Sequence, residues 1–217
     1  MNTIRNILFL TACLWGMNAQ ALDARGQEKL REIQSEWAEI KYRSPDKAQE
    51  QAFERLDATT REALAESADA PELLIWRGIV LASWAGAKGG LGALDLVKQA
   101  RSSLEAALEK DPAALDGSAW TSLGSLYYQV PGWPIGFGND ERAEEMLLKA
   151  LAINPDGIDP NYFYGDYLVH ERRYDEARAA LLKARAAAPR SGRELADEGR
   201  RGEIDALLAK IDEKTQK

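Results

Sequence analysis

A pattern of four spaced residues recurs three times along this 217-residue chain and constrains its fold more than any other feature. An alanine is followed after four residues by a leucine, after seven by another alanine and after twelve by a proline. The three sets are Ala100, Leu104, Ala107 and Pro112; Ala143, Leu147, Ala150 and Pro155; and Ala177, Leu181, Ala184 and Pro189. Steps of three and four residues place side chains on one face of an α-helix, and the proline ends it. The pattern therefore predicts similar helical units stacked in a row.

Each of these helices needs a partner, and the stretches that precede them supply it. Trp120, Leu123, Gly124 and Tyr127 stand before the second set, and Gly165 stands before the third. A small residue lets two helices cross closely, while larger apolar side chains fill the space between successive pairs. These spacings resemble the tetratricopeptide repeat, a helical hairpin of about 34 residues whose first helix carries W-x-x-L-G-x-x-Y. The resemblance predicts an all-α solenoid of helical hairpins, a fold that serves binding.

The repeats also predict the domain organisation. The expected parts are a signal peptide at 1–21, an N-terminal helical hairpin at 22–70, three tetratricopeptide-like units at 71–112, 117–155 and 158–189, and a C-terminal capping helix with a tail at 190–217. The N-terminal hairpin is expected to pair helices at 27–42 and 48–67 because apolar residues recur there at helical spacing. The first helix of the earliest unit, at about 71–86, is expected to be irregular. The capping helix covers an apolar face that would otherwise meet water.

Residues 1–21 have the features of a signal peptide. Arg5 provides a short positive region, Ile7–Met17 is largely apolar, and Ala19-Gln20-Ala21 fits the small-x-small cleavage site. The apolar stretch is too short to cross a bilayer as a helix. We therefore expect export to the periplasm, with Leu22 as the first mature residue.

Cysteine content and charge narrow the classes of partner. Cys13 is the only cysteine, so a chain that begins at Leu22 has no thiol for a disulfide, a zinc site or a nucleophile. The alternative processing is a lipoprotein anchored to the membrane through Cys13, because Leu10-Thr11-Ala12-Cys13 resembles a lipobox. The net charge of −7 disfavours nonspecific binding to nucleic acid and to anionic lipid.

A candidate binding groove follows from the repeat register, because the first helix of each hairpin lines the concave face of such arrays. Offsets from the signature tryptophan place the following residues there: Ser118, Thr121, Ser125, Tyr128 and Gln129 in one unit, and Asp159, Tyr162, Asp166, Val169 and His170 in the next. Together they predict a polar, aromatic groove with acidic points, suited to a peptide or a small polar ligand. The alternative is that these positions are only solvated.

The insertion at 130–139 is the most unusual stretch of the sequence. Trp133, Ile135 and Phe137 alternate there with glycine and proline. Three large apolar side chains are unfavourable to expose together, so the loop either presents a surface to a partner or folds back over the repeats. Both interpretations stay open on the sequence alone.

Catalysis, metal binding and cofactor binding find little support in the sequence. His170 is the only histidine, and no nucleophile-elbow sequence accompanies it. Asp156, Asp159 and Asp166 do not have the spacing of a calcium loop. The glycine-rich stretch 88–92 lacks the Lys-Ser/Thr ending of a phosphate-binding loop. We therefore expect no enzymatic activity, no metal and no cofactor.

A narrower resemblance rests on the stretch from Leu123 to Ala143, which contains the aromatic insertion, followed by Leu147 to Pro155. Together with the signal segment and the enlarged turns, this stretch resembles the periplasmic T component of TRAP-type transporters over about 71–189. The resemblance implies a tetratricopeptide protein that is not an enzyme, that forms a homo-oligomer and that contacts another envelope protein, the substrate-binding subunit of the transporter.

Two further functions remain as alternatives. The first is a periplasmic protein that binds a small molecule, an organic acid or an apolar ligand, in a pocket lined by Tyr128, Tyr162 and Tyr164 and closed by the insertion. The second is a scaffold for envelope assembly, which differs from the transporter adaptor only in its partner.

Overall fold

A computed structural model describes residues 22–215 of the chain. The predicted signal peptide and Cys13 lie outside these residues. The described residues form nine α-helices: α1 (Ala24–Arg43), α2 (Asp46–Glu66), α3 (Pro71–Lys88), α4 (Leu94–Lys110), α5 (Ala114–Gln129), α6 (Asp140–Ile153), α7 (Ile158–His170), α8 (Tyr174–Ala186) and α9 (Glu194–Thr215). A short 3-10 helix, Leu91–Ala93, precedes α4. The all-α fold expected from the sequence is therefore confirmed. Among residues 22–215, no helix is both long and apolar enough to span a membrane.

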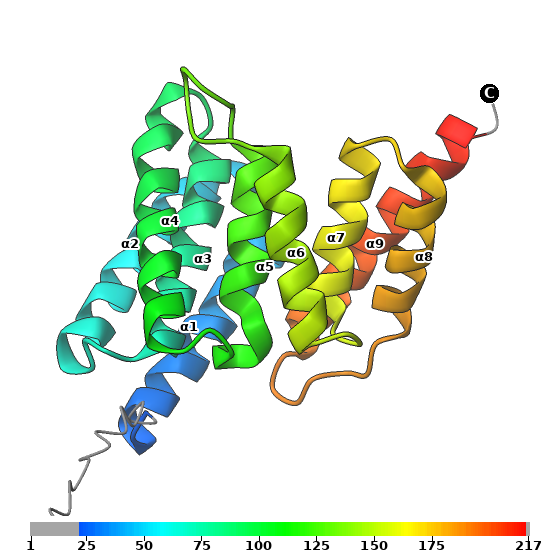
Figure 1. The fold of residues 1–217 in the computed structure, drawn as a ribbon. Helices are drawn as coiled ribbons and strands as arrows, with labels where there is room; N and C mark the ends of the chain where they lie inside the picture. The colour runs from blue at the N-terminus through cyan, green and yellow to red at the C-terminus, as the bar shows by residue number, and fades with distance from the viewer. Residues whose placement is uncertain (1–21, 216–217) are drawn as a thin grey trace, which may run out of the picture.

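The helices pair in chain order into antiparallel hairpins that stand side by side, as Figure 1 shows for α3–α4, α5–α6 and α7–α8. Local signals set several boundaries. The Asp23 carboxylate accepts a hydrogen bond from the backbone N–H of Gly26 at the start of α1, and the Asn139 side chain caps α6 in the same way through Arg142. Pro71 opens α3, where its missing N–H costs nothing. α5 begins with a left-handed turn at 115–117 and is a regular helix from Ser118 onward.

The same close contact between helices recurs in three hairpins. A side-chain carbon added to Gly124 would lie 2.6 Å from Cγ of Leu147 and 3.2 Å from the carbonyl oxygen of Ala143. Gly165 stands in the same relation to Leu181, and Gly78 to Leu104. Each leucine is fully buried, so each glycine opens the space into which the leucine of the following helix packs. This repeated geometry makes the fold a tetratricopeptide-like helical repeat.

The expectation that the first helix of the earliest unit is irregular is wrong. α3 is a continuous helix of 18 residues, and Gly78 holds its crossing position. Leu74 and Leu81 stand at the offsets that Trp120 and Tyr127 occupy in α5. The leucine side chains fill the same layer without the signature aromatic residues, so the helix keeps the repeat geometry while its sequence departs from the pattern.

The C-terminal helix does more than cover the last repeat. α9 packs against α7 and α8, with Ile204, Leu208 and Ile211 buried, and it also contacts α1. A side-chain carbon at Gly199 would lie 2.3 Å from the Tyr42 ring, so the absence of a side chain at Gly199 allows this close approach of α9 to α1. The curvature of the array therefore returns its last helix to its first, and a cleft lies between them.

Candidate ligand-binding cleft

The concave side of the array contains a cleft of about 690 Å³. It is lined by the first helix of every hairpin (α1, α3, α5 and α7), by the start of α2, and by α9 with the segment before it. Six residues predicted for the groove line it: Ser118, Thr121, Ser125, Gln129, Asp159 and Tyr162. Helices distant in sequence thus contribute to one site, and its volume falls in the range of small-molecule and peptide-anchor pockets.

Hydroxyl groups from α5 cover one side of the cleft. Thr121 is buried, and the Ser118 hydroxyl donates a hydrogen bond of 2.6 Å to the carbonyl of Leu115. Ser122 lies one helical turn after Ser118, and Ser125 one turn after Thr121, and both line the cleft. No hydrogen bond to another group in the described part of the chain is found for either hydroxyl, so each can donate one to a ligand.

Aromatic side chains line the opposite part. The rings of Trp37 and Trp76 meet edge to face with centroids 5.8 Å apart, and the indole N–H of Trp37 donates to the hydroxyl of Ser83 at 2.8 Å. Tyr162 and Phe163 form a similar edge-to-face pair on α7 at 5.0 Å. Such rings offer a large apolar surface with few rotatable bonds, which suits a flat or aliphatic ligand.

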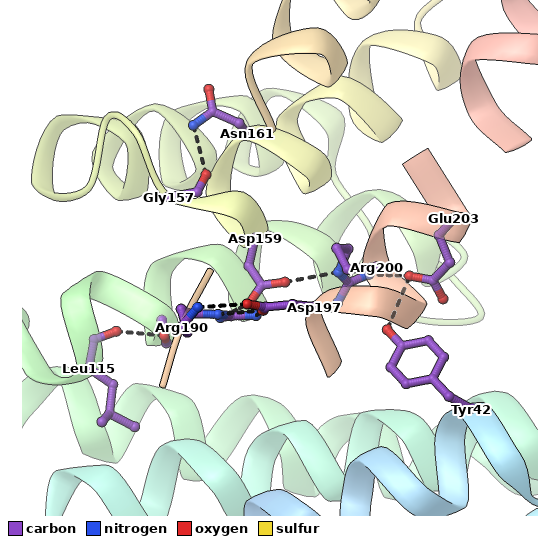
Figure 2. A network of polar contacts seen from close by, with 10 residues as sticks. Tyr42, Leu115, Gly157, Asp159, Asn161, Arg190, Asp197, Arg200 and Glu203 are labelled. Atoms are coloured by element: carbon purple, nitrogen blue, oxygen red, sulfur yellow. Dashed lines mark hydrogen bonds and ion pairs between the residues drawn. The ribbon is translucent and has the colours of Figure 1, made fainter. Parts of the chain in front are cut away.

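A network of charged side chains joins α7, α9 and α1 at the end of the cleft. Figure 2 shows Asp159 between Arg190 and Arg200: one of its oxygens accepts from Nε of Arg200 at 2.9 Å and the other from Arg190 at 2.6 Å. Arg190 also donates to Asp197 through Nε and through its backbone N–H, both at 2.8 Å. Arg200 pairs with Glu203 at 2.5 Å, and Glu203 accepts from the Tyr42 hydroxyl at 3.4 Å.

The network is largely removed from water, and its charges compensate one another. The Arg200 side chain is only 9% exposed and lies over the rings of Tyr162 and Phe163, at 4.2 and 4.7 Å from their centroids. Burial alone would raise the pKa of Asp159, but the charges of Arg200 and Arg190 outweigh it and lower the pKa from 3.8 to about 2. Burial would likewise lower the pKa of Arg200, yet Asp159 and the other nearby acids raise it above its ordinary value. Asp159 and Arg200 therefore stay ionised at neutral pH.

Arg193 differs from the other arginines of the cleft. Its guanidinium lies over the Trp76 ring, 4.9 Å from the centroid, and its Nε is buried without a hydrogen-bond partner among the described residues. Burial and the neighbouring charge of Arg190 lower the pKa of Arg193. Because a guanidinium remains protonated at any physiological pH, Arg193 carries a positive charge in the cleft and is not suited to proton transfer.

Four residues predicted for the groove do not line this cleft. Tyr128 is buried, and its hydroxyl donates a hydrogen bond of 2.7 Å to Asp166. His170 is exposed at the end of α7, with its Nε2 3.7 Å from a carboxylate oxygen of Asp140 on α6. These three residues are therefore not among those that line the cleft. Val169, predicted for the same face, is also buried in the core.

The expected pocket of three tyrosines is also not formed. Of Tyr128, Tyr162 and Tyr164, only Tyr162 lines the cleft. Tyr164 stacks on Tyr167, with ring centroids 6.3 Å apart. No residue of the insertion at 130–139 lines the cleft, so the insertion does not close it.

Within the insertion, Phe137 packs against the repeats, whereas Trp133 and Ile135 are exposed. Phe137 is half-buried, with its ring 5.4 Å from that of Tyr127 and the Arg101 guanidinium 4.6 Å above it. The backbone N–H of Gly138 donates to the carbonyl of Pro131 at 3.0 Å and holds the loop closed. Trp133 and Ile135 remain 90% and 57% exposed. The proposed partner surface of the loop is thus reduced to Trp133 and Ile135, because Phe137 packs against Tyr127 of α5.

The arginines are the cleft residues that sequence reasoning missed. Arg190, Arg193, Asp197 and Arg200 follow one another at steps of three, four and three residues. Only Asp197 and Arg200 lie on α9, whereas Arg190 and Arg193 lie in the segment before it. Charged residues that recur at this spacing could have indicated that the C-terminal part of the chain has a second partner besides α8.

Comparisons with known proteins show a likeness in structure and none in sequence family. No family model matches the chain, and no curated protein matches its sequence. The fold is similar to the crystal structure of a thermophilic TPR protein of Thermus thermophilus, with 19% sequence identity and a TM-score of 0.43. The similar region covers 82% of this chain and 98% of that protein.

Proposed function

We propose that this protein is a non-enzymatic adaptor that binds a segment of another protein in the concave cleft. The observation that carries this proposal is the cleft itself, which every inner helix and α9 line together. Helical-repeat arrays bind partners on such concave surfaces, because each repeat contributes a few side chains to one continuous site. Aromatic walls, free hydroxyls and arginines supply the apolar contacts and hydrogen bonds that a peptide segment needs.

The exposed Trp133 and Ile135 provide a second point of contact in this proposal. Both side chains are exposed on the insertion that joins α5 to α6, and neither lines the cleft. Exposed tryptophan is unfavourable in water and is enriched at the energetic centres of protein interfaces. A folded partner whose segment enters the cleft can cover the insertion at the same time.

The partner that we propose is the substrate-binding subunit of a TRAP-type transporter. The support for it is the resemblance of the stretch from Leu123 to Pro155 to the T component of these transporters. Export to the periplasm, proposed on the features of residues 1–21, would bring the two proteins into one compartment. An intact mass of the exported protein distinguishes cleavage before Leu22 from lipidation at Cys13.

Parallel affinity capture tests the proposal. Three forms of Leu22–Lys217 are immobilised beside the parent: Ser125→Trp, which places a bulky ring in the cleft; Ser102→Trp, which adds the same ring on the exposed side of α4; and Trp133→Ser. Envelope proteins retained by each form are identified by mass spectrometry. We expect a substrate-binding subunit on the parent and on Ser102→Trp, and its loss from Ser125→Trp.

The other outcomes are equally informative. A partner retained in full by Ser125→Trp contradicts binding in the cleft. If the partner is lost only from the Trp133→Ser form and the Ser125→Trp form still binds it, the interface lies at the insertion and not in the cleft. Recovery of a different envelope protein with the expected dependence on Ser125 keeps the adaptor function and removes the transporter assignment.

A small-molecule binding protein is the second candidate function. The observation in its favour is the cleft volume of about 690 Å³ together with the aromatic walls, which suit a compact ligand as well as a peptide. A ligand that binds only the native state raises the thermal midpoint, so a panel of organic acids and lipids separates this function from the first.

A further inference from the structure

We propose that Arg193 is the recognition group for a ligand carboxylate in the cleft. The proposal rests on the proposed function in one respect, namely that the cleft is where a ligand binds. It adds the residue that recognises the ligand and the chemical class of the ligand group that this residue binds.

The first step in the argument is that Arg193 has no charged partner among residues 22–215. Asp159 uses both of its oxygens on Arg200 and Arg190, and Asp197 uses both of its oxygens on Arg190. Neither aspartate forms an ion pair with Arg193, although both lie near enough to attract it. The guanidinium lines the cleft with a buried Nε that lacks an acceptor. A partly buried, unpaired cation destabilises a fold, and the Trp76 ring beneath it offsets only part of that cost.

The second step concerns the charge of the ligand. The carboxylates of the network, Asp159, Asp197 and Glu203, are paired with Arg190, Arg200 and Lys41. Arg193 is therefore the cation beside the network that has no ion-pair partner among the described residues. A carboxylate neutralises this charge, whereas a doubly charged phosphate would add a repelled negative charge beside Asp159 and Asp197.

The third step concerns shape. A carboxylate is planar, and two N–H groups of a guanidinium match its two oxygens in a bidentate pair. The rest of the ligand then lies beside Trp76, with Tyr162 and Phe163 in the same cleft, so an apolar or aromatic body next to the carboxylate is favoured. A free organic acid and the C-terminal residue of a partner protein share this chemistry.

Titration of the purified protein with matched acid and amide probes tests the proposal. The free-acid probe is 3-phenylpropionate, with 3-phenylpropanamide as its neutral counterpart. The peptide probe is N-acetyl-Ala-Ala-Phe with a free C-terminus, against the same peptide amide. Binding is followed by two-dimensional NMR, which also reports whether each variant is folded. The variants are Arg193→Gln, Arg193→Lys, and Arg55→Gln as a matched control on the exposed side of α2, outside the cleft.

We expect at least one acid to bind about tenfold or more tightly than its amide, and Arg193→Gln to remove that preference. Arg193→Lys retains part of it and Arg55→Gln retains all of it. Preference for 3-phenylpropionate over the peptide identifies a free organic acid as the source of the carboxylate, and the reverse identifies a partner C-terminus. Arg193→Gln removes the contact with Trp76 but also a charge that has no ion-pair partner among the described residues, so the thermal midpoint of this variant should not fall below that of the parent.

Three results would overturn the proposal: neither acid binds, each acid binds no better than its amide, or Arg193→Gln binds the acids as the parent does. The acid-against-amide comparison needs no variant, so it holds even where a substitution perturbs the fold. Capture of a protein partner that depends on Ser125 but not on Arg193 leaves the proposed function intact and removes only the carboxylate site.

Discussion

Replacing Asp159 with asparagine should lower the free energy of unfolding by about 3 kcal/mol, because the change leaves two arginines without their shared carboxylate. Asp159 contacts both Arg190 and Arg200, and the Arg200 side chain is only 9% exposed. The asparagine has nearly the same shape but carries no charge, so the loss reports on ion pairing and not on packing. Urea denaturation followed by circular dichroism at 222 nm measures the difference.

The pH dependence of that difference identifies its cause. The folded-state pKa of Asp159, about 2, lies below its ordinary value of 3.8. The stabilisation from its ionised form is therefore complete above the ordinary pKa and is lost as the pH falls through the folded pKa. Of the deficit of the asparagine variant, about 2 kcal/mol should accordingly disappear between roughly pH 4 and pH 2.

The matched control is Asp156→Asn, the same substitution on the preceding turn. Asp156 is exposed and pairs only with the exposed Lys183 among the described residues, at 3.1 Å. Exposed ion pairs contribute little to stability, so no measurable change is expected. Equal effects of the two substitutions, or a deficit at Asp159 that does not depend on pH, would contradict the role given to the network.

Replacing Gly124 with alanine should lower the free energy of unfolding by about 2 kcal/mol, because the added methyl group has no space. It would lie 2.6 Å from Cγ of Leu147 and 3.2 Å from the carbonyl oxygen of Ala143. The carbonyl belongs to the backbone of α6 and cannot move without shifting the helix. The same urea titration measures this change.

Gly202→Ala is the matched control and should have the opposite sign. No neighbouring atom of the described residues lies within 4 Å of the position that its side-chain carbon would take. Alanine in an exposed helix is more favourable than glycine by about 0.5–1 kcal/mol, so this variant should be slightly more stable than the parent. Destabilisation at Gly202, or none at Gly124, would contradict the view that helix crossings at glycine define the repeat.

The helices and their pairing could be predicted from the sequence because close packing dictates which residues stand at the crossings. Ala143, Leu147 and Gly124 are required by the contact between α5 and α6, and the same types recur where the contact recurs. Gly78 escaped notice because leucines replace the aromatic residues around it, and packing tolerates that exchange of volume. The local sequence pattern therefore predicts the repeat wherever the signature residues are present.

The cleft could be predicted only in part. Ser118, Thr121, Ser125 and Tyr162 follow from the register of each helix, and these residues do line it. Arg193 and Arg200 reach the same cleft because the array curves until α9 meets α1, where Gly199 admits the Tyr42 ring. Curvature is a sum of small rotations between successive hairpins, so no local sequence pattern reports it.

The most direct test of the central claim, that the concave cleft is the binding face, is hydrogen exchange of the protein alone and in complex with the partner recovered by capture. Exchange should slow in the cleft-lining parts of α3, α5 and α9 and stay unchanged in α4, α6 and α8. Slowing confined to the outer helices or to the insertion at 130–139, with α3, α5 and α9 unchanged, would contradict the claim.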